Sequence, residues 1–212
     1  MMDSTTQPHG LGRRALWLAA VLVLTAAQGG CARSGLLTQP VMDTNQTSSA
    51  KATEVSPAGD VPDNAVFVLY KNDTGGYQIQ YVEGWSVTPQ KDGGVAITDI
   101  DSAEVVELRA LPTGDLMHYV TSTDEAQVKA QTQAYQRTDL KSLTVNQQAV
   151  VALIYTGIST PDAVTNKTRP ITSQRYYIPG PQHRLAILTL TTPNDVDNVD
   201  AFHQMLESFT WQ

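Results

Sequence analysis

Cysteine is nearly absent from this sequence, since Cys31 is the only one among 212 residues. A single cysteine excludes an intrachain disulfide and any metal site that needs several thiolates. The four histidines supply no substitute, because none belongs to a metal-spaced pair such as His-Glu-x-x-His. We therefore expect neither a metal ion nor another cofactor.

Motifs for catalysis and nucleotide binding are missing too. The sequence has no Gly-x-Ser-x-Gly elbow, no phosphate loop and no dinucleotide fingerprint. A Ser-His-Asp triad assembles in space, so its spacing in the sequence leaves that possibility open. The 14 Lys and Arg residues, set against 21 Asp and Glu, form no basic stripe. The composition therefore argues against a nucleic-acid partner, and the missing motifs favour a protein that is not an enzyme.

An apolar leader opens the chain. Arg13-Arg14 precede the run from Ala15 to Ala27, which only Thr25 interrupts. This run is shorter than the roughly 20 residues that a membrane-spanning helix needs, and it suits the apolar region of an export signal. Residues 1–30 are therefore predicted to be a signal peptide.

The residues that end this leader resemble a bacterial lipobox. Gln28-Gly29-Gly30 lead directly into Cys31, although an aliphatic residue usually stands three positions before the cysteine. The resemblance implies that the leader is cut before Cys31 and that its sulfur is diacylated. Ordinary signal cleavage near Ala27 and an uncleaved anchor are the alternatives. The pattern predicts lipid anchoring to a membrane, on the extracytoplasmic face of a bacterial cell envelope.

A polar segment separates this cysteine from the rest of the chain. Ala32 to Asn64 contains no aromatic residue and is rich in Thr, Ser, Ala, Pro, Gln and Asp. Such a segment buries too little apolar surface to offset the entropy lost on ordering. We predict that residues 31–64 are the lipidated cysteine and a disordered tether, and that residues 65–212 form one domain.

Strand patterns dominate that domain. In Tyr77 to Tyr81 the aromatic and aliphatic residues alternate with glutamines, as in a strand with one buried face. Trp85 follows a Gly turn and is predicted to fold back over this face as a core residue. The further predicted strands are Val66–Tyr70, Ser86–Pro89, Val95–Thr98, Val105–Leu111, Leu143–Val145, Ala149–Tyr155, Ile171–Ile178 and Leu185–Thr191. Short connections predict an antiparallel sheet, and the unbroken apolar run of Ala149–Tyr155 predicts a strand covered on both faces.

Helical spacing occurs in two places. Leu116, Tyr119 and Val120 start one helix, and Ser122 with Glu125 forms a capping-box pattern for a helix that runs to about residue 136. A last helix begins after Pro193-Asn194-Asp195. Its predicted apolar stripe consists of Val199, Phe202, Leu206 and Phe209.

This order of elements resembles the PsbP-like family, named after an extrinsic subunit of photosystem II; a yeast Ran-binding nuclear-import protein shares the fold. The family's opening pattern, aromatic-x-Ile-x-Tyr-Pro-x-x-Trp, is matched by Tyr77, Ile79, Tyr81 and Trp85, with Val82 in the place of Pro. Its later elements are matched by Ala149 to Gly157, Tyr176-Tyr177 and Ser208-Phe209. The resemblance implies an α+β fold in which helices flank an antiparallel sheet, as an α/β/α sandwich. No photosystem residue carries over, because the partner-binding segments have no match.

Two groups of side chains invite a chemical interpretation. Asp99, Asp101, Glu104 and Glu107 are the densest carboxylates and could offer oxygen ligands to Ca²⁺, but they fit no EF-hand, and a solvated turn is the favoured interpretation. His118 lies one helical turn after Asp115, so a pocket around His118 would suit an envelope hydrolase.

The favoured function is partner binding. Alternation places Arg175 and Tyr177 on one face, and Arg169 flanks them beside the polar segment Gly157–Pro170. Tyrosine and arginine are favoured at protein interfaces. We therefore predict a membrane-anchored binding or assembly module for an envelope protein complex, with a partner-binding patch made of these three residues. A hydrolase and a secreted solute-binding protein are the alternatives.

Overall fold

Two antiparallel sheets organise the domain. The computed structural model describes residues 59–212. The predictions for the leader 1–30, for Cys31 and for most of the tether lie outside the described residues. Among residues 59–212, no helix has the length and apolar character needed to cross a membrane.

The larger sheet has seven strands, and each neighbouring pair is antiparallel. In spatial order the strands are β3 (Ser86–Pro89), β4 (Val95–Thr98), β5 (Ala103–Ala110), β9 (Arg184–Pro193), β8 (Pro170–Pro179), β7 (Gln148–Ile158) and β6 (Gln133–Val145). The predicted hairpin around Pro179-Gly180-Pro181 is confirmed, since β8 and β9 pair along their whole length.

The smaller sheet has the order β1-β2-β10, with β1 at Phe67–Asn72, β2 at Tyr77–Val82 and β10 at Thr210–Trp211. The first five strands therefore do not form one sheet, because the chain changes sheets at the turn before Trp85. Strand β10 pairs Trp211 with Tyr77 and so brings the end of the chain back to its first hairpin.

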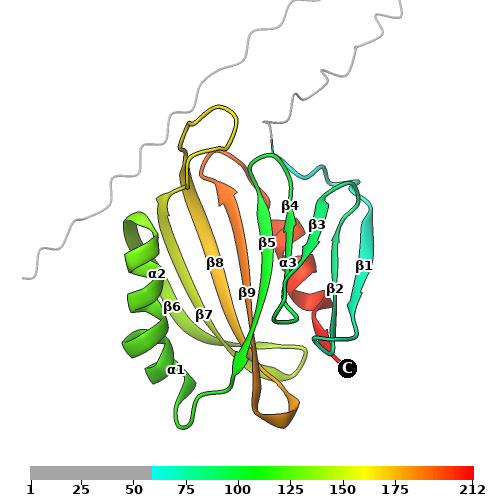
Figure 1. Cartoon of the computed structure of the whole chain (residues 1–212), viewed down its shortest axis with the longest axis vertical. Helices are drawn as coiled ribbons and strands as arrows, with labels where there is room; N and C mark the ends of the chain where they lie inside the picture. Colours follow the sequence, from blue (N-terminus) through cyan, green and yellow to red (C-terminus); the bar gives the residue numbers. More distant parts are fainter. Residues whose placement is uncertain (1–58) are drawn as a thin grey trace, which may run out of the picture. The chain divides into compact units, whose positions relative to one another are not determined.

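Apolar residues fill both faces of the seven-stranded sheet. On one face the sheet packs against the smaller sheet and α3 (Val199–Ser208), and on the other it packs against the helical segment of residues 116–131. Strand β7 alternates between the two cores, with Val150 on the first face and Val151 on the second, which confirms a strand covered on both faces. Figure 1 shows α1 and α2 beside β6, and α3 packs against β2. The predicted α+β fold is confirmed.

The helical segment is continuous but changes its winding. It consists of α1 (Leu116–Tyr119), a π-helical turn (Val120–Asp124) and α2 (Glu125–Gln131). The predicted capping box is wrong, since the Ser122 hydroxyl lies inside this segment and donates to the carbonyl of His118 at 2.7 Å. The segment ends at Gln131 rather than near 136, because β6 starts at once to pair with β7. Gly157 permits this close return, as a Cβ at its position would clash with Thr132.

Aromatic packing in the first core differs in detail from the prediction. Trp85 is buried in the same cluster as Tyr77 and Ile79, which confirms it as a core residue. The rings around Tyr77, however, come mainly from the end of the chain, with Phe209 at 5.5 Å and Trp211 at 6.5 Å between centroids. The predicted stripe on the last helix is also wrong at one end, since Val199 in the first turn is 63% exposed.

Candidate functional site

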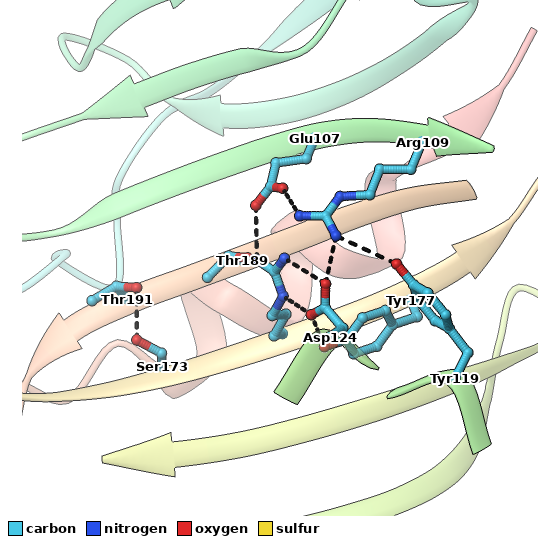
Figure 2. A network of polar contacts seen from close by, with 9 residues as sticks. Glu107, Arg109, Tyr119, Asp124, Ser173, Tyr177, Thr189 and Thr191 are labelled. Carbon is cyan, nitrogen blue, oxygen red and sulfur yellow. Dashed lines mark hydrogen bonds and ion pairs between the residues drawn. The ribbon is translucent and has the colours of Figure 1, made fainter. Parts of the chain in front are cut away.

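A network of charged side chains lies between the helical segment and the second face of the seven-stranded sheet (Figure 2). Its centre is Asp124, the last residue of the π-helical turn, whose side chain has no solvent exposure. Strand β8 contributes Arg175 and Tyr177, which are 6% and 0% exposed. Strand β5 contributes Glu107 and Arg109. The network thus joins three elements that are distant in the sequence.

Three side chains donate hydrogen bonds to the Asp124 carboxylate. Nη1 of Arg109 lies 2.6 Å from its Oδ1, while Nε of Arg175 and the hydroxyl of Tyr177 lie 2.9 and 2.6 Å from its Oδ2. Hydrogen bonds between ionised partners are shorter and stronger than neutral ones. Desolvation of this buried acid is therefore offset by donors from two strands.

A second carboxylate closes the network toward the surface. Glu107 accepts from Nη1 of Arg175 at 2.8 Å and from Nη2 of Arg109 at 2.7 Å. The same Nη1 of Arg175 also donates to the Thr189 hydroxyl at 2.8 Å. Two guanidinium groups thus face two carboxylates, so the formal charges of the network cancel.

Local structure explains how these groups meet. Period-2 alternation places the side chains of Glu107 and Arg109 on one face of β5, and the same rule aligns those of Arg175 and Tyr177 on β8. On the helical side, a π turn inserts one residue into the helical register, and such insertions frequently occur at functional sites. This turn carries Asp124 toward Arg109, whose Nη1 also donates to the Tyr119 hydroxyl at 3.4 Å.

The environment keeps each acid and base of the network in one charge state. Burial alone would raise the pKa of Asp124, but the hydrogen bonds from Arg175 and Tyr177 and the nearby guanidinium charges lower that pKa below its ordinary value. The pKa of Glu107 is lowered in the same way, by Arg175 and Arg109 against the effect of burial. Burial raises the pKa of Tyr177, and its hydrogen bond to Asp124 adds to the rise. A general acid or base needs a pKa near the working pH, so these groups are poorly suited to proton transfer.

The outer part of the network reaches solvent. The side chains of Glu107 and Arg109 are 33% and 31% exposed. Glu107 also lines a depression of about 570 Å³, together with residues of β5 and of the turn between β3 and β4. The other lining residues are Gln90, Lys91, Asp92, Val105 and Val106. The buried ion pairs therefore lie next to a depression whose lining residues include both signs of charge and apolar side chains.

The residues of the predicted partner patch lie in different surroundings from those expected. Alternation correctly places Arg175 and Tyr177 on one face, but the helical segment covers that face, so both side chains are buried. Arg169 is 48% exposed and pairs with Asp101 at 2.8 Å, outside the network. A role for these three residues in partner binding stays a prediction, and two of them, Arg175 and Tyr177, are not accessible at the surface.

His118 is exposed on α1. The carboxylate of Asp115 accepts from the backbone N–H of His118 at 2.9 Å, as an N-cap of the helix. That contact stabilises the first helical turn and does not orient the imidazole.

Three of the four carboxylates considered for Ca²⁺ lie in different surroundings. Glu107 belongs to the network, Asp101 pairs with Arg169, and Glu104 is buried on the opposite face of β5. Within residues 59–212, no group of three or more His, Cys, Asp or Glu side chains is arranged to hold a metal ion.

Asp124 and Arg109 were missed by the sequence analysis, although the sequence holds a signal for the first. Val120, Asp124 and Val128 are spaced by four residues, and both valines are buried. An acid in the middle of an apolar helical stripe must find partners when the stripe is buried. The sequence does not indicate which strands provide them.

Comparisons with known proteins reveal similarity at the level of structure. No family model matches the sequence, and a search of curated proteins found no match. The structure resembles a cyanobacterial PsbP from Synechocystis sp. PCC 6803, with 16% identity and a TM-score of 0.48, over 74% of this chain and 100% of that one. It also resembles the Saccharomyces cerevisiae Ran-binding protein Mog1p, with 11% identity and a TM-score of 0.49, over 69% of this chain and 96% of that one.

A Pseudomonas aeruginosa protein of unknown function is a further match, with 13% identity and a TM-score of 0.43, over 69% of this chain and 97% of that one. The similar structures thus include a PsbP and a Ran-binding protein, each at a sequence identity of 16% or less.

Proposed function

We propose that this protein is a lipid-anchored extracytoplasmic protein whose domain binds a protein partner in the cell envelope and catalyses no reaction. The observation that carries the proposal is the position of the ion-pair network. Its inner half is buried, its outer half, Glu107 and Arg109, is partly exposed, and Glu107 lines the depression.

A rigid polar surface of this kind suits recognition. Side chains whose rotamers are held by hydrogen bonds lose little conformational entropy when a partner binds. Both carboxylate oxygens of Glu107 and both terminal nitrogens of Arg109 are already engaged within the domain. A partner therefore meets a preformed surface, and Lys91 and Asp92 at its rim add exposed charges.

Site-specific photo-crosslinking tests this surface in the full chain. A photoreactive amino acid at Lys91 is expected to give one defined adduct with a partner protein in the envelope. The same amino acid at Lys141, an exposed position on β6, serves as the matched control and is expected to give none. Equal labelling from both positions, or no adduct from Lys91, would contradict the proposed surface.

The proposed anchor is tested separately at Cys31. The residues before it resemble a lipobox, and two acyl chains anchor a protein stably where one binds only marginally. We expect that Cys31→Ser releases the protein from membranes and leaves the precursor uncut, as seen by fractionation and by labelling with a fatty-acid analogue. Wild-type protein that is cleaved before Cys31 but takes up no label would exclude lipidation.

A further inference from the structure

The edges of the two sheets differ in how well they are protected. A free edge exposes unpaired N–H and C=O groups, and proteins usually shield it with short strands, proline, charges or bulges. Strand β3 has four residues and ends at Pro89, and β10 has only two residues. Strand β6 carries two irregularities of register in its first half and the charged residues Arg137, Asp139 and Lys141. Each of these edges has at least one such protection.

Strand β1 is protected least. It pairs with β2 without a register shift, contains no proline and has Lys71 as its only charged residue. Within residues 59–212, no strand pairs with its outer edge. Figure 1 shows β1 at the outer margin of the smaller sheet. Val66 just before the strand and Leu69 within it are 57% and 51% exposed.

The hydrogen-bond pattern shows which backbone groups face outward. The carbonyl of Val66 accepts from the N–H of Glu83, so Val66 directs its backbone groups toward the neighbouring chain segment. Antiparallel pairing alternates along a strand, so the backbone groups of Val68 and Tyr70 also face β2. The N–H and C=O groups of Phe67, Leu69 and Lys71 therefore point away from β2, and a further strand could bond to them.

We propose that the outer edge of β1 pairs in antiparallel fashion with β1 of a second copy of this chain. A twofold axis at Leu69 places the two Leu69 residues opposite each other and sets each Lys71 opposite Phe67 of the other copy. Each such pair exchanges two backbone hydrogen bonds. This register keeps the two lysines apart, so no like charges face each other, and it covers the exposed Leu69 with its counterpart in the other copy.

The pairing also strengthens the smaller sheet. A sheet of three strands, one of them only two residues long, has few ladder bonds of its own. Joining two copies through β1 creates one continuous sheet that crosses the dimer. The interface is isologous, the commonest arrangement in homodimers.

Sedimentation velocity of the full chain in mild detergent tests the dimer over a range of protein concentrations. Leu69→Pro removes an outward N–H and leaves the bonds between β1 and β2 in place. We expect this change to weaken dimerisation about tenfold or more, because both bonds of the central pair are lost. Leu69→Lys should weaken it as well, while Thr144→Lys adds the same charge to the edge of β6 and should leave dimerisation unchanged.

Amide hydrogen exchange gives a second readout that does not depend on how well a variant folds. In the wild-type chain, protection of the Leu69 amide should rise with protein concentration, whereas the Val68 amide should be protected at every concentration. A chain that stays monomeric at all concentrations overturns the proposal. So does a dimer that Leu69→Pro and Leu69→Lys leave intact, or a Leu69 amide whose protection does not depend on concentration.

Discussion

Two buried acids on opposite faces of one sheet show how the surroundings set the state of a charge. Asp124 and Glu104 both have no exposed side-chain surface. Asp124 receives three close hydrogen bonds from charged or polar side chains, whereas neither oxygen of Glu104 has a partner among the described residues. Asp124 therefore has a lowered pKa, and burial raises the pKa of Glu104 well above its ordinary value. Partners, rather than burial alone, decide whether an interior carboxyl is ionised.

The neighbours of the two acids account for this difference. Glu104 pairs across the sheet with Ile97 on β4 and Leu190 on β9, and all three belong to the face packed against α3. Tyr77 is an ionisable residue of the same core cluster as Ile97 and Leu190. That tyrosine is a weaker acid than the carboxyl and provides no compensating positive charge. Burial without a compensating partner therefore favours the protonated form of Glu104 and raises its pKa above the ordinary value.

Asp124→Ala should cause the largest loss of stability. It leaves the guanidinium groups of Arg175 and Arg109 without their buried counter-ion, and breaking a buried pair typically costs about 3–5 kcal/mol. Urea denaturation measures this loss, with Asp139→Ala at an exposed position as the matched control. A variant that unfolds at the same urea concentration as the wild-type chain would contradict the importance of the network.

Tyr177→Phe should have a smaller effect on the same network. It removes one hydrogen bond to Asp124 but keeps the ring and both arginine contacts. A hydrogen bond to a charged group contributes about 1.5–3 kcal/mol, so we expect a loss within this range. The double variant Asp124→Ala/Tyr177→Phe sharpens the test, because the two effects should then be clearly less than additive.

The pH dependence of stability should reveal Glu104. Its raised pKa means that the folded state keeps a proton that the unfolded chain releases above about pH 4.3. The contribution of Glu104 to the free energy of unfolding is thus fully present below that pH and is lost as the pH rises toward the folded-state pKa. The unfolding free energy falls by at most about 1.4 kcal/mol per pH unit over this range.

Glu104→Gln should remove this dependence of the unfolding free energy on pH. Thermal melts at intervals of about one pH unit, from about pH 5 to about pH 8, measure it. Asp124 changes stability in the opposite direction, because its lowered pKa provides stability that is lost only as the solution becomes acidic. An unchanged slope in the Glu104→Gln variant would show that the carboxyl is ionised in the folded domain.

Arg137→Ala should have the smallest effect. Arg137 pairs with Glu125 at 3.0 Å, but its side chain is 45% exposed, so solvent screens the interaction. Exposed ion pairs contribute about 0.2–1 kcal/mol, and we expect a loss in this range by urea denaturation. If Arg137→Ala lowered the free energy of unfolding as much as Asp124→Ala, buried and exposed ion pairs would contribute equally to stability, against our expectation.

Much of the fold could be predicted from local patterns. Alternation in Tyr77 to Tyr81 and the unbroken apolar run at Ala149–Tyr155 correctly predicted a half-buried strand and a strand covered on both faces. The hairpin around Pro179-Gly180-Pro181 was also correct. These features follow from hydrophobic periodicity and turn chemistry, which act over a few neighbouring residues.

The site could be predicted only in part. Alternation placed Arg175 and Tyr177 on one face, but their exposure depended on whether a distant element would cover that face. The helical segment does so and brings Asp124 to them from 51 residues away in the sequence. Such pairings are set by tertiary packing, which a local pattern does not contain.

The sequence by itself determined the alternation of buried and exposed positions, the breaks between elements and the lack of cysteine pairs in this chain. Each of these depends on residue type and short-range spacing. Only the tertiary structure decided that the chain divides into two sheets, that Trp211 returns to Tyr77, and that the pKa values of two acids with similar burial shift in opposite directions. The physical reason is that the free energy of a buried group depends on which partners the fold places within hydrogen-bonding distance.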